Sequence, residues 1–208
     1  MTTRNISSAG TLAAVGLFAA LTLLATSVLR IPTPTFGYIH IGDCFVLLAG
    51  LLLGPVYGGL AAGIGSALSD LLAGYVVWVP GTFLIKFLTA AAAALVFQRL
   101  YARKRTTANH SESASAPAEK SRSLSGSARL FLPAALCGEL VMTAGYFLYN
   151  ILIVSLVSST ADAGLAAAAA VSLAEIPFNL IQGSAGIILA AVLYPVFSRS
   201  LLRTLLPG

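Results

Sequence analysis

The sequence predicts an all-α integral membrane protein, and two observations carry this prediction. Of the 208 residues, 58% are hydrophobic and only 9% are charged, whereas a soluble domain carries roughly 25% charged residues. Glycine- and proline-containing breaks also divide the chain into apolar stretches, most of which approach the roughly 20 residues needed to cross a bilayer. We therefore expect one membrane domain over residues 1–208, a bundle of six transmembrane helices in the lipid bilayer, and no binding of nucleic acid.

The six expected helices are delimited by charged residues or by prolines, which disfavour helix in the residue before them. Their approximate ranges are 11–29, 40–53, 56–73, 81–98, 130–157 and 171–197. The second range is short and is followed by Gly54-Pro55, so the alternative is one kinked helix across this break and five spans in total. The proline-containing segment 31–41 is expected to be an extended loop, and the small residues of 158–170 a second loop.

Residues 99–129 differ from the rest of the chain. They are rich in arginine, lysine and serine and have no apolar periodicity, which predicts a flexible, disordered linker. Because cytoplasmic loops carry the excess of Lys and Arg, we expect this linker in the cytoplasm. The N-terminus, with Arg4, and the C-terminus, with Arg199 and Arg203, are expected on the same side. The net charge of +5 is then a sign of membrane orientation.

Polar side chains recur at helical spacing on one face of each of the last two expected helices. They are Glu139, Thr143, Tyr146 and Asn150 in the first of these, and Glu175, Asn179, Gln182 and Gly186 in the second. Because polar groups facing lipid are costly, both faces are expected to look into the bundle. Side-chain amides donate and accept hydrogen bonds at once, which suits the ring nitrogens and hydroxyls of a small polar ligand. Hydrogen bonding between helices without a ligand is the alternative.

The first half of the chain contains four ionisable residues and one tryptophan that are candidates for the same polar site. Neighbouring antiparallel helices would bring Asp70 and Lys86 to similar depth, so we expect either an ion pair between them or Lys86 reaching a ligand oxygen. His40 and Asp43 are expected to cap the second helix at its N-terminus. Trp78 is typical of an interfacial anchor, although an aromatic ring at a pocket mouth could equally stack on a flat ligand.

Indications of catalysis are weak. The sequence shows no zinc-ligand spacing, no phosphate-binding glycine loop and no convincing Ser-His-Asp arrangement, so we assign no catalytic residue, metal ligand or cofactor. Three alternatives to a binding protein stay open. One is an intramembrane enzyme using Glu139 and Glu175, another a stand-alone, gradient-driven carrier with Asp70 and Glu139 as proton sites, and the last a purely structural membrane subunit.

Four long segments resemble the substrate-binding S components of energy-coupling factor (ECF) vitamin transporters. They are GYIHIGDCFVLLAGLLLGPVYGGLAAGIGSALSDLLAGY, GTFLIKFL, GELVMTAGYFLYN and EIPFNLIQGSAGIILA. The similarity covers roughly residues 10–200 apart from the linker, and the chain resembles in particular the riboflavin, pyridoxine and hydroxymethylpyrimidine branch. This resemblance implies capture of a small, flat, water-soluble vitamin outside the cell and its delivery across a bacterial-type plasma membrane, with ATP hydrolysis on other subunits.

The resemblance also implies partners and site residues. The partners would be a transmembrane coupling subunit and two cytoplasmic ATPases, and the first and third loops would close over the vitamin. Small residues of the first helix would pack on the coupling subunit, with Ala9, Ala13, Gly16 and Ala20 as candidates. The expected vitamin contacts are Glu139, Tyr146, Asn150, Asn179 and Gln182, with Lys86 and Trp78 from the outer loops. The amides and Tyr146 would form hydrogen bonds, and Trp78 would stack on the ring.

Overall fold

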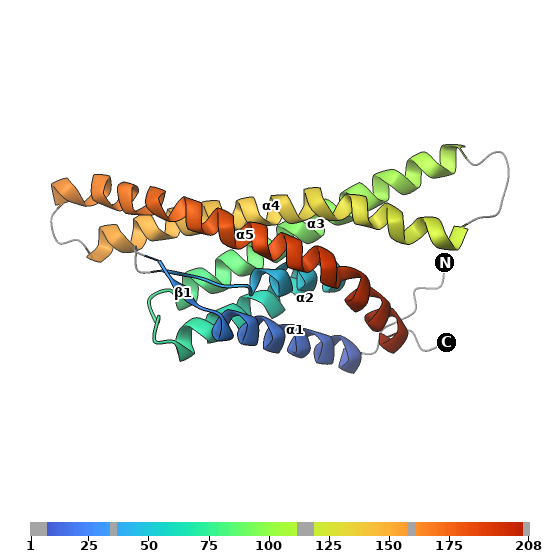
Figure 1. The fold of residues 1–208 in the computed structure, drawn as a ribbon, viewed down its shortest axis with the longest axis horizontal. Helices are drawn as coiled ribbons and strands as arrows, with labels where there is room; N and C mark the ends of the chain where they lie inside the picture. The colour runs from blue at the N-terminus through green and yellow to red at the C-terminus, as the bar shows by residue number, and fades with distance from the viewer. Residues whose placement is uncertain (1–7, 34–36, 112–118, 158–160, 206–208) are drawn as a thin grey trace.

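In the computed structural model, residues 8–33, 37–111, 119–157 and 161–205 are described. This part of the chain folds into five α-helices and one short β-hairpin (Figure 1). The elements are α1 (Ser8–Val28), β1 (Ile31–Pro32), β2 (Tyr38–Ile39), α2 (Asp43–Leu72), α3 (Val79–Ser111), α4 (Glu119–Val157) and α5 (Ala161–Leu205). Each of the five helices contains a stretch long and apolar enough to cross a membrane. The prediction of an all-helical membrane protein is confirmed.

The helices run along one long axis, with α2 at the centre of the bundle. α2 packs against α1, α3 and α5, and α4 packs against α3 and α5. In Figure 1, α1 begins and α5 ends toward the right, whereas the β-hairpin and the start of α3 lie toward the left. The buried core includes Phe18 of α1, Leu47 and Leu48 of α2, and Phe131 of α4, all nearly or fully inaccessible. The hairpin lies at the left end of α1, α2 and α3, while the end of α4 and the start of α5 extend farther to the left (Figure 1).

α2 is not a straight helix, because its backbone is broken at Gly54. Gly54 has φ 85° and ψ −179°, a conformation that is essentially restricted to glycine. A Cβ atom at Gly58 would lie 2.3 Å from the carbonyl oxygen of Ala49, although nine residues of straight helix would separate the two by about 13 Å. The segments 43–53 and 55–72 therefore fold back on each other. The expected ranges 40–53 and 56–73 fall on these two segments of the single helix α2, and the count of six membrane helices stays a prediction.

The expectation of a flexible linker over 99–129 is wrong for most of that range. α3 continues to Ser111 and α4 already begins at Glu119, while residues 112–118 lie outside the described part. The residues that follow the expected span, RLYARKR, are mostly good helix formers. A helix already nucleated in the membrane extends through such residues one hydrogen bond at a time, so a polar composition did not end it.

The two loop expectations have opposite outcomes. The extended character predicted for 31–41 is confirmed, since Ile31 pairs with Ile39 and Pro32 with Tyr38 in an antiparallel ladder. The loop predicted for 158–170 is wrong from residue 161 onward, where α5 begins. The alanine-rich run there favours helix, and small residues alone do not indicate a loop.

Candidate functional site

A cavity lies between the β-hairpin and the helix ends beneath it. Its lining combines aromatic rings, side-chain amides, hydroxyls and two carboxylates, contributed by the hairpin and by all five helices or the turns that follow them. The empty space among these side chains is about 650 Å³, its open mouth included. That size and this mixture of apolar surface with a few polar groups are typical of small-molecule sites.

The aromatic residues form two pairs in the lining. The ring centroids of Tyr38 and Tyr75 are 5.2 Å apart, and those of Trp78 and Tyr146 are 6.4 Å apart. The hydroxyl of Tyr146 donates a hydrogen bond to Thr82 Oγ1 at 3.3 Å, which fixes the ring against α3. Rings held in this way offer flat apolar surface to a flat ligand.

Three side-chain amides line the cavity, but they are not equivalent. Gln182 accepts a hydrogen bond from the backbone N–H of His40 at 3.1 Å and donates one to Asp43 Oδ2 at 2.7 Å. Its amide thus ties α5 to the hairpin and to α2. The amides of Asn150 and Asn179 make no hydrogen bond to another described residue, although both line the cavity and Asn150 is only 4% exposed. Those two amides are available to a ligand.

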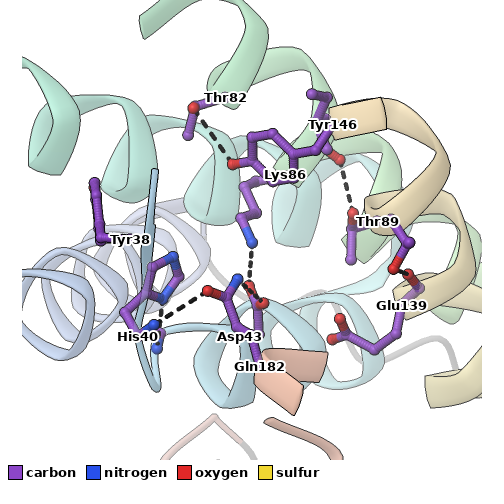
Figure 2. Close-up of polar contacts among 12 residues, drawn as sticks. Tyr38, His40, Asp43, Thr82, Lys86, Thr89, Glu139, Tyr146 and Gln182 are labelled. Atoms are coloured by element: carbon purple, nitrogen blue, oxygen red, sulfur yellow. Dashed lines mark hydrogen bonds and ion pairs between the residues drawn. The ribbon is translucent and has the colours of Figure 1, made fainter. Parts of the chain in front are cut away.

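A buried ion pair lies directly beside the cavity (Figure 2). The ammonium group of Lys86 binds Asp43 Oδ1, and both side chains are completely inaccessible to solvent. Lys86 Nζ also lies 5.2 Å from the ring centroid of Tyr146. Lys86 is not itself part of the lining, so its charge serves Asp43 rather than the open space.

This pairing corrects two expectations. The partner of Lys86 is Asp43 and not Asp70, which accepts a hydrogen bond from the hydroxyl of Tyr38 instead. Asp70 and Lys86 do not pair because they lie at different depths in the bundle. Asp70 is two residues from the end of α2, whereas Lys86 is about two turns into α3. Capping also differs, since Gly42 occupies the N-cap of α2 and no side chain caps the helix. His40 accepts, through Nδ1, a hydrogen bond from the N–H of Gly42.

The carboxyl group of Glu139 is buried. It is 6% exposed, and neither carboxylate oxygen has a hydrogen-bond partner among the described residues. A Cβ at Gly183 would lie 2.8 Å from Glu139 Oε2, so the carboxyl group packs against α5. Glu175 lies eight residues from Gly183, about 12 Å along that helix, and accepts a hydrogen bond from Thr33 instead. The two glutamates do not form an acid–base pair.

The hairpin is held over the cavity by contacts to two helices. Thr33 Oγ1 donates to Glu175 Oε1 at 2.8 Å, Tyr38 donates to Asp70, and His40 donates to Gln182. In this way β1 and β2 join α2 to α5 across the open end of the bundle. A ligand in the cavity would lie beneath this connection.

Comparison with known proteins shows what kind of protein has this architecture. The family model described as ECF-type riboflavin transporter, S component, matches residues 6–199. The chain belongs to this family. Its members are described as the S components of ECF-type riboflavin transporters.

Two individual similarities accompany this assignment. The S component superposes on a solved structure described as the S component of a bacterial ECF transporter, with a TM-score of 0.54, 19% identity, and coverage of 94% of this chain and 99% of the other. At that identity the likeness shows the shared fold. A Pyrococcus woesei protein described as "Uncharacterized protein in gap 3'region" is 44% identical over 64 residues, which are 30% of this chain and 43% of that protein. The chain therefore matches less than half of that relative.

The structure separates the site residues predicted from the sequence into two groups. Trp78, Tyr146, Asn150, Asn179 and Gln182 come together around the cavity, whereas Lys86 and Glu139 are absent from its lining. The sequence reasoning missed the hairpin residue Tyr38 and the hydroxyls of Thr26 and Ser66, which also line the cavity. The sequence pattern that could have indicated them is weak. Within apolar sequence, polar side chains lie four residues apart at positions 22 and 26 of α1 and at positions 66 and 70 of α2.

His40 is expected to stay neutral at physiological pH. Burial lowers its pKa from 6.5 to about 3, and Lys86 and Arg30 oppose its charging while Asp43 favours it. Above pH 6.5 the imidazole is neutral in both folded and unfolded S component. Below that value only the unfolded state gains the proton, so the contribution of His40 to stability falls as the pH approaches about 3.

This expectation is testable by NMR because the chain has only two histidines. In a His110→Gln variant the remaining imidazole signal reports His40 alone. We expect its chemical shift to be constant between about pH 5 and pH 8, the range in which an ordinary histidine titrates. A titration midpoint near 6.5 would contradict the lowered pKa of His40, whose side chain is half-buried at the cavity.

Proposed function

We propose that this S component binds a small, flat, water-soluble vitamin or precursor of the riboflavin, pyridoxine or hydroxymethylpyrimidine class at its outer face. It delivers this ligand across the membrane as part of an ATP-driven importer. The main support is the cavity beneath the hairpin, in which aromatic pairs lie beside the amides of Asn150 and Asn179, which have no hydrogen-bond partner among the described residues. Flat rings with polar edges match such a lining.

Within this proposal the site residues have different roles. Asn150 and Asn179 form hydrogen bonds to the ligand edge, and Trp78 and Tyr146 contact its ring. Gln182, whose amide already binds His40 and Asp43, positions the hairpin over the ligand. Lys86 and Glu139 lie outside the lining and contribute to the polar interior that supports it.

We further propose six membrane crossings with both termini in the cytoplasm. The reversal of α2 at Gly54 supports this count, because it turns one helical range into two segments of opposite direction. The exposed basic residues Arg99, Arg103 and Lys104 lie on α3 at the end opposite the hairpin. By the positive-inside rule that end faces the cytoplasm, so the cavity faces outward.

The proposed partners are a transmembrane coupling subunit and two cytoplasmic ATPase subunits. The residues assigned to the coupling contact, Ala9, Ala13, Gly16 and Ala20, are all exposed on one side of α1. A Cβ at Gly16 would meet no atom within 4 Å. A helix face of small residues that nothing in the described chain covers supports close packing against another membrane helix.

The substitution Asn179→Ala tests the binding role. We expect it to weaken vitamin binding about tenfold, or about 1.4 kcal/mol, with normal expression, because it removes one hydrogen-bonding edge of the cavity. Titration of the purified protein with riboflavin, pyridoxine and hydroxymethylpyrimidine, followed by calorimetry, identifies the ligand and measures the change.

The matched control is Thr106→Ala, which removes an exposed hydroxyl that bonds the Ala102 carbonyl on α3, outside the cavity. Its affinity should equal that of the wild type. If none of the three vitamins binds the wild-type protein, the proposed function is wrong. If Asn179→Ala binds with unchanged affinity, the assignment of Asn179 is wrong and the function stands.

One observation favours a second candidate, a proton-driven carrier that works alone. Glu139 is a buried carboxyl group without a hydrogen-bond partner among the described residues, as expected of a proton site inside a membrane protein. Vitamin uptake by this chain alone into ATP-free proteoliposomes, abolished by Glu139→Gln, would establish the carrier. Uptake that requires the coupling subunit and ATP would exclude it.

A further inference from the structure

Two hydroxyl groups in the cavity wall have no hydrogen-bond partner among the described residues. Thr26 on α1 is 1% exposed and Ser66 on α2 is fully buried, both line the cavity, and neither hydroxyl oxygen has a partner among the described residues. A buried polar group left unsatisfied costs about 1–3 kcal/mol. A group that enters the cavity and bonds these hydroxyls would recover that cost.

Contacts on either side place the two hydroxyls in one section of the interface between α1 and α2. Ser27 and Ser69 are joined by a hydrogen bond of 3.0 Å. A Cβ at Gly65 would lie 2.9 Å from Cβ of Thr22. In each of these contacts the α2 residue number exceeds the α1 residue number by 42 or 43. Because residue numbers rise together along both helices, α1 and this part of α2 run parallel. Thr26 and Ser66 then differ by about three residues, or 4 to 5 Å, along the axis.

The charges around the cavity restrict the ligand further. Two carboxylates, Asp70 and Glu175, belong to the described lining, and no lysine or arginine does. The nearest cations have other partners, because Lys86 binds Asp43, and Arg30 donates to Ser69 at 2.7 Å and to the carbonyl oxygen of Thr26 at 3.2 Å. A phosphate ester would meet carboxylates without a compensating cation, which disfavours its binding.

We propose that Thr26 and Ser66 form a subsite for an aliphatic hydroxyl group of the ligand, and that the cavity selects the uncharged, non-phosphorylated form of the vitamin. This subsite rests on the proposed function and assigns two residues to the aliphatic hydroxyl group that riboflavin, pyridoxine and hydroxymethylpyrimidine share. A hydroxyl group both donates and accepts, as do Thr26 and Ser66, so one alcohol can satisfy both side chains. The neighbouring carboxylate of Asp70 provides a further acceptor in the same wall.

The test compares ligands with and without the hydroxyl group. The pairs are riboflavin and lumiflavin, pyridoxine and its analogue with methyl groups in place of both hydroxymethyl groups, and 4-amino-5-hydroxymethyl-2-methylpyrimidine and its 5-methyl analogue. Whichever hydroxylated compound binds the wild-type protein is used together with its partner. We expect Thr26→Val and Ser66→Ala each to weaken binding of the hydroxylated compound about tenfold, or about 1.4 kcal/mol, and to leave binding of its partner unchanged.

Thr22→Val is the matched control. Thr22 lies one turn before Thr26 on α1 and is fully buried, and its hydroxyl also has no partner in the part of the chain that the structure describes, but it does not line the cavity. Its removal should leave both affinities unchanged. None of the three variants should unfold the protein, because each removes a buried polar group that makes no hydrogen bond; thermal unfolding without ligand checks this.

The outcomes separate the subsite from the proposed function. If no compound binds the wild-type protein, both fall. If a vitamin binds but Thr26→Val and Ser66→Ala behave like Thr22→Val, the subsite is refuted and the function remains. For charge selection we expect the phosphate ester of the bound vitamin, such as riboflavin 5′-phosphate, to bind at least about tenfold more weakly. Equal affinity for the ester would overturn that part.

Discussion

Replacing Lys86 with methionine is expected to lower the free energy of unfolding by about 3–5 kcal/mol, the largest effect of any single substitution considered. Lys86 and Asp43 are both completely inaccessible and pair with each other. Methionine has similar length but no charge, so the variant leaves the Asp43 carboxylate buried, with the Gln182 amide as its one remaining hydrogen-bond partner among the described side chains. Thermal unfolding of the purified protein in mild detergent measures the loss.

The double variant Asp43→Asn/Lys86→Met identifies the cause. Because it removes both charges together, we expect it to be more stable than Lys86→Met alone, as buried pairs replaced by neutral groups often are. Lys104→Met, at an exposed position of α3, should change stability little. A double variant no more stable than Lys86→Met would mean that Lys86 contributes by packing and not by charge.

Much of the fold follows from local sequence. The apolar stretches within α1, α3, α4 and α5 are each long enough to predict a membrane helix from that stretch alone. The helix ends were less predictable: α3 and α4 extend into polar sequence because helix propensity, and not hydropathy, decides where a helix stops outside the membrane. Composition therefore located the helices better than it located their ends.

The candidate site was predictable where polar residues repeat on a helix face. Tyr146 and Asn150 on α4, and Asn179 and Gln182 on α5, stand out because lipid-facing positions would not carry them. The single hydroxyls of Thr26 and Ser66 gave no comparable signal, since threonine and serine are common in membrane helices. Their role in the wall depends on the packing of α1 against α2, which a linear pattern does not contain.

The partner of Lys86 was predicted wrongly for a related reason. Sequence proximity across the turn between α2 and α3 favoured Asp70, but the true partner, Asp43, is 43 residues away. Asp43 reaches Lys86 because the short segment 43–53 begins deep in the bundle instead of at its surface. The sequence left this open, because Gly54-Pro55 is compatible with both a kink and a reversal.

The reversal of α2 at Gly54 brings Gly58 against the backbone of Ala49. Gly58→Ala is expected to lower the free energy of unfolding by about 1–3 kcal/mol, because the added methyl group would lie 2.3 Å from the carbonyl oxygen of Ala49. The same change at Gly16, where a Cβ meets nothing within 4 Å, should be neutral or slightly stabilising, since alanine is the better helix former. Thermal unfolding of both variants in detergent measures the two changes in stability.

In a merely kinked helix, residues 49 and 58 would be too far apart to touch, and the two glycine substitutions would behave alike. A selective loss at Gly58 is thus the signature of two segments folded against each other, the arrangement that brings Asp43 to Lys86.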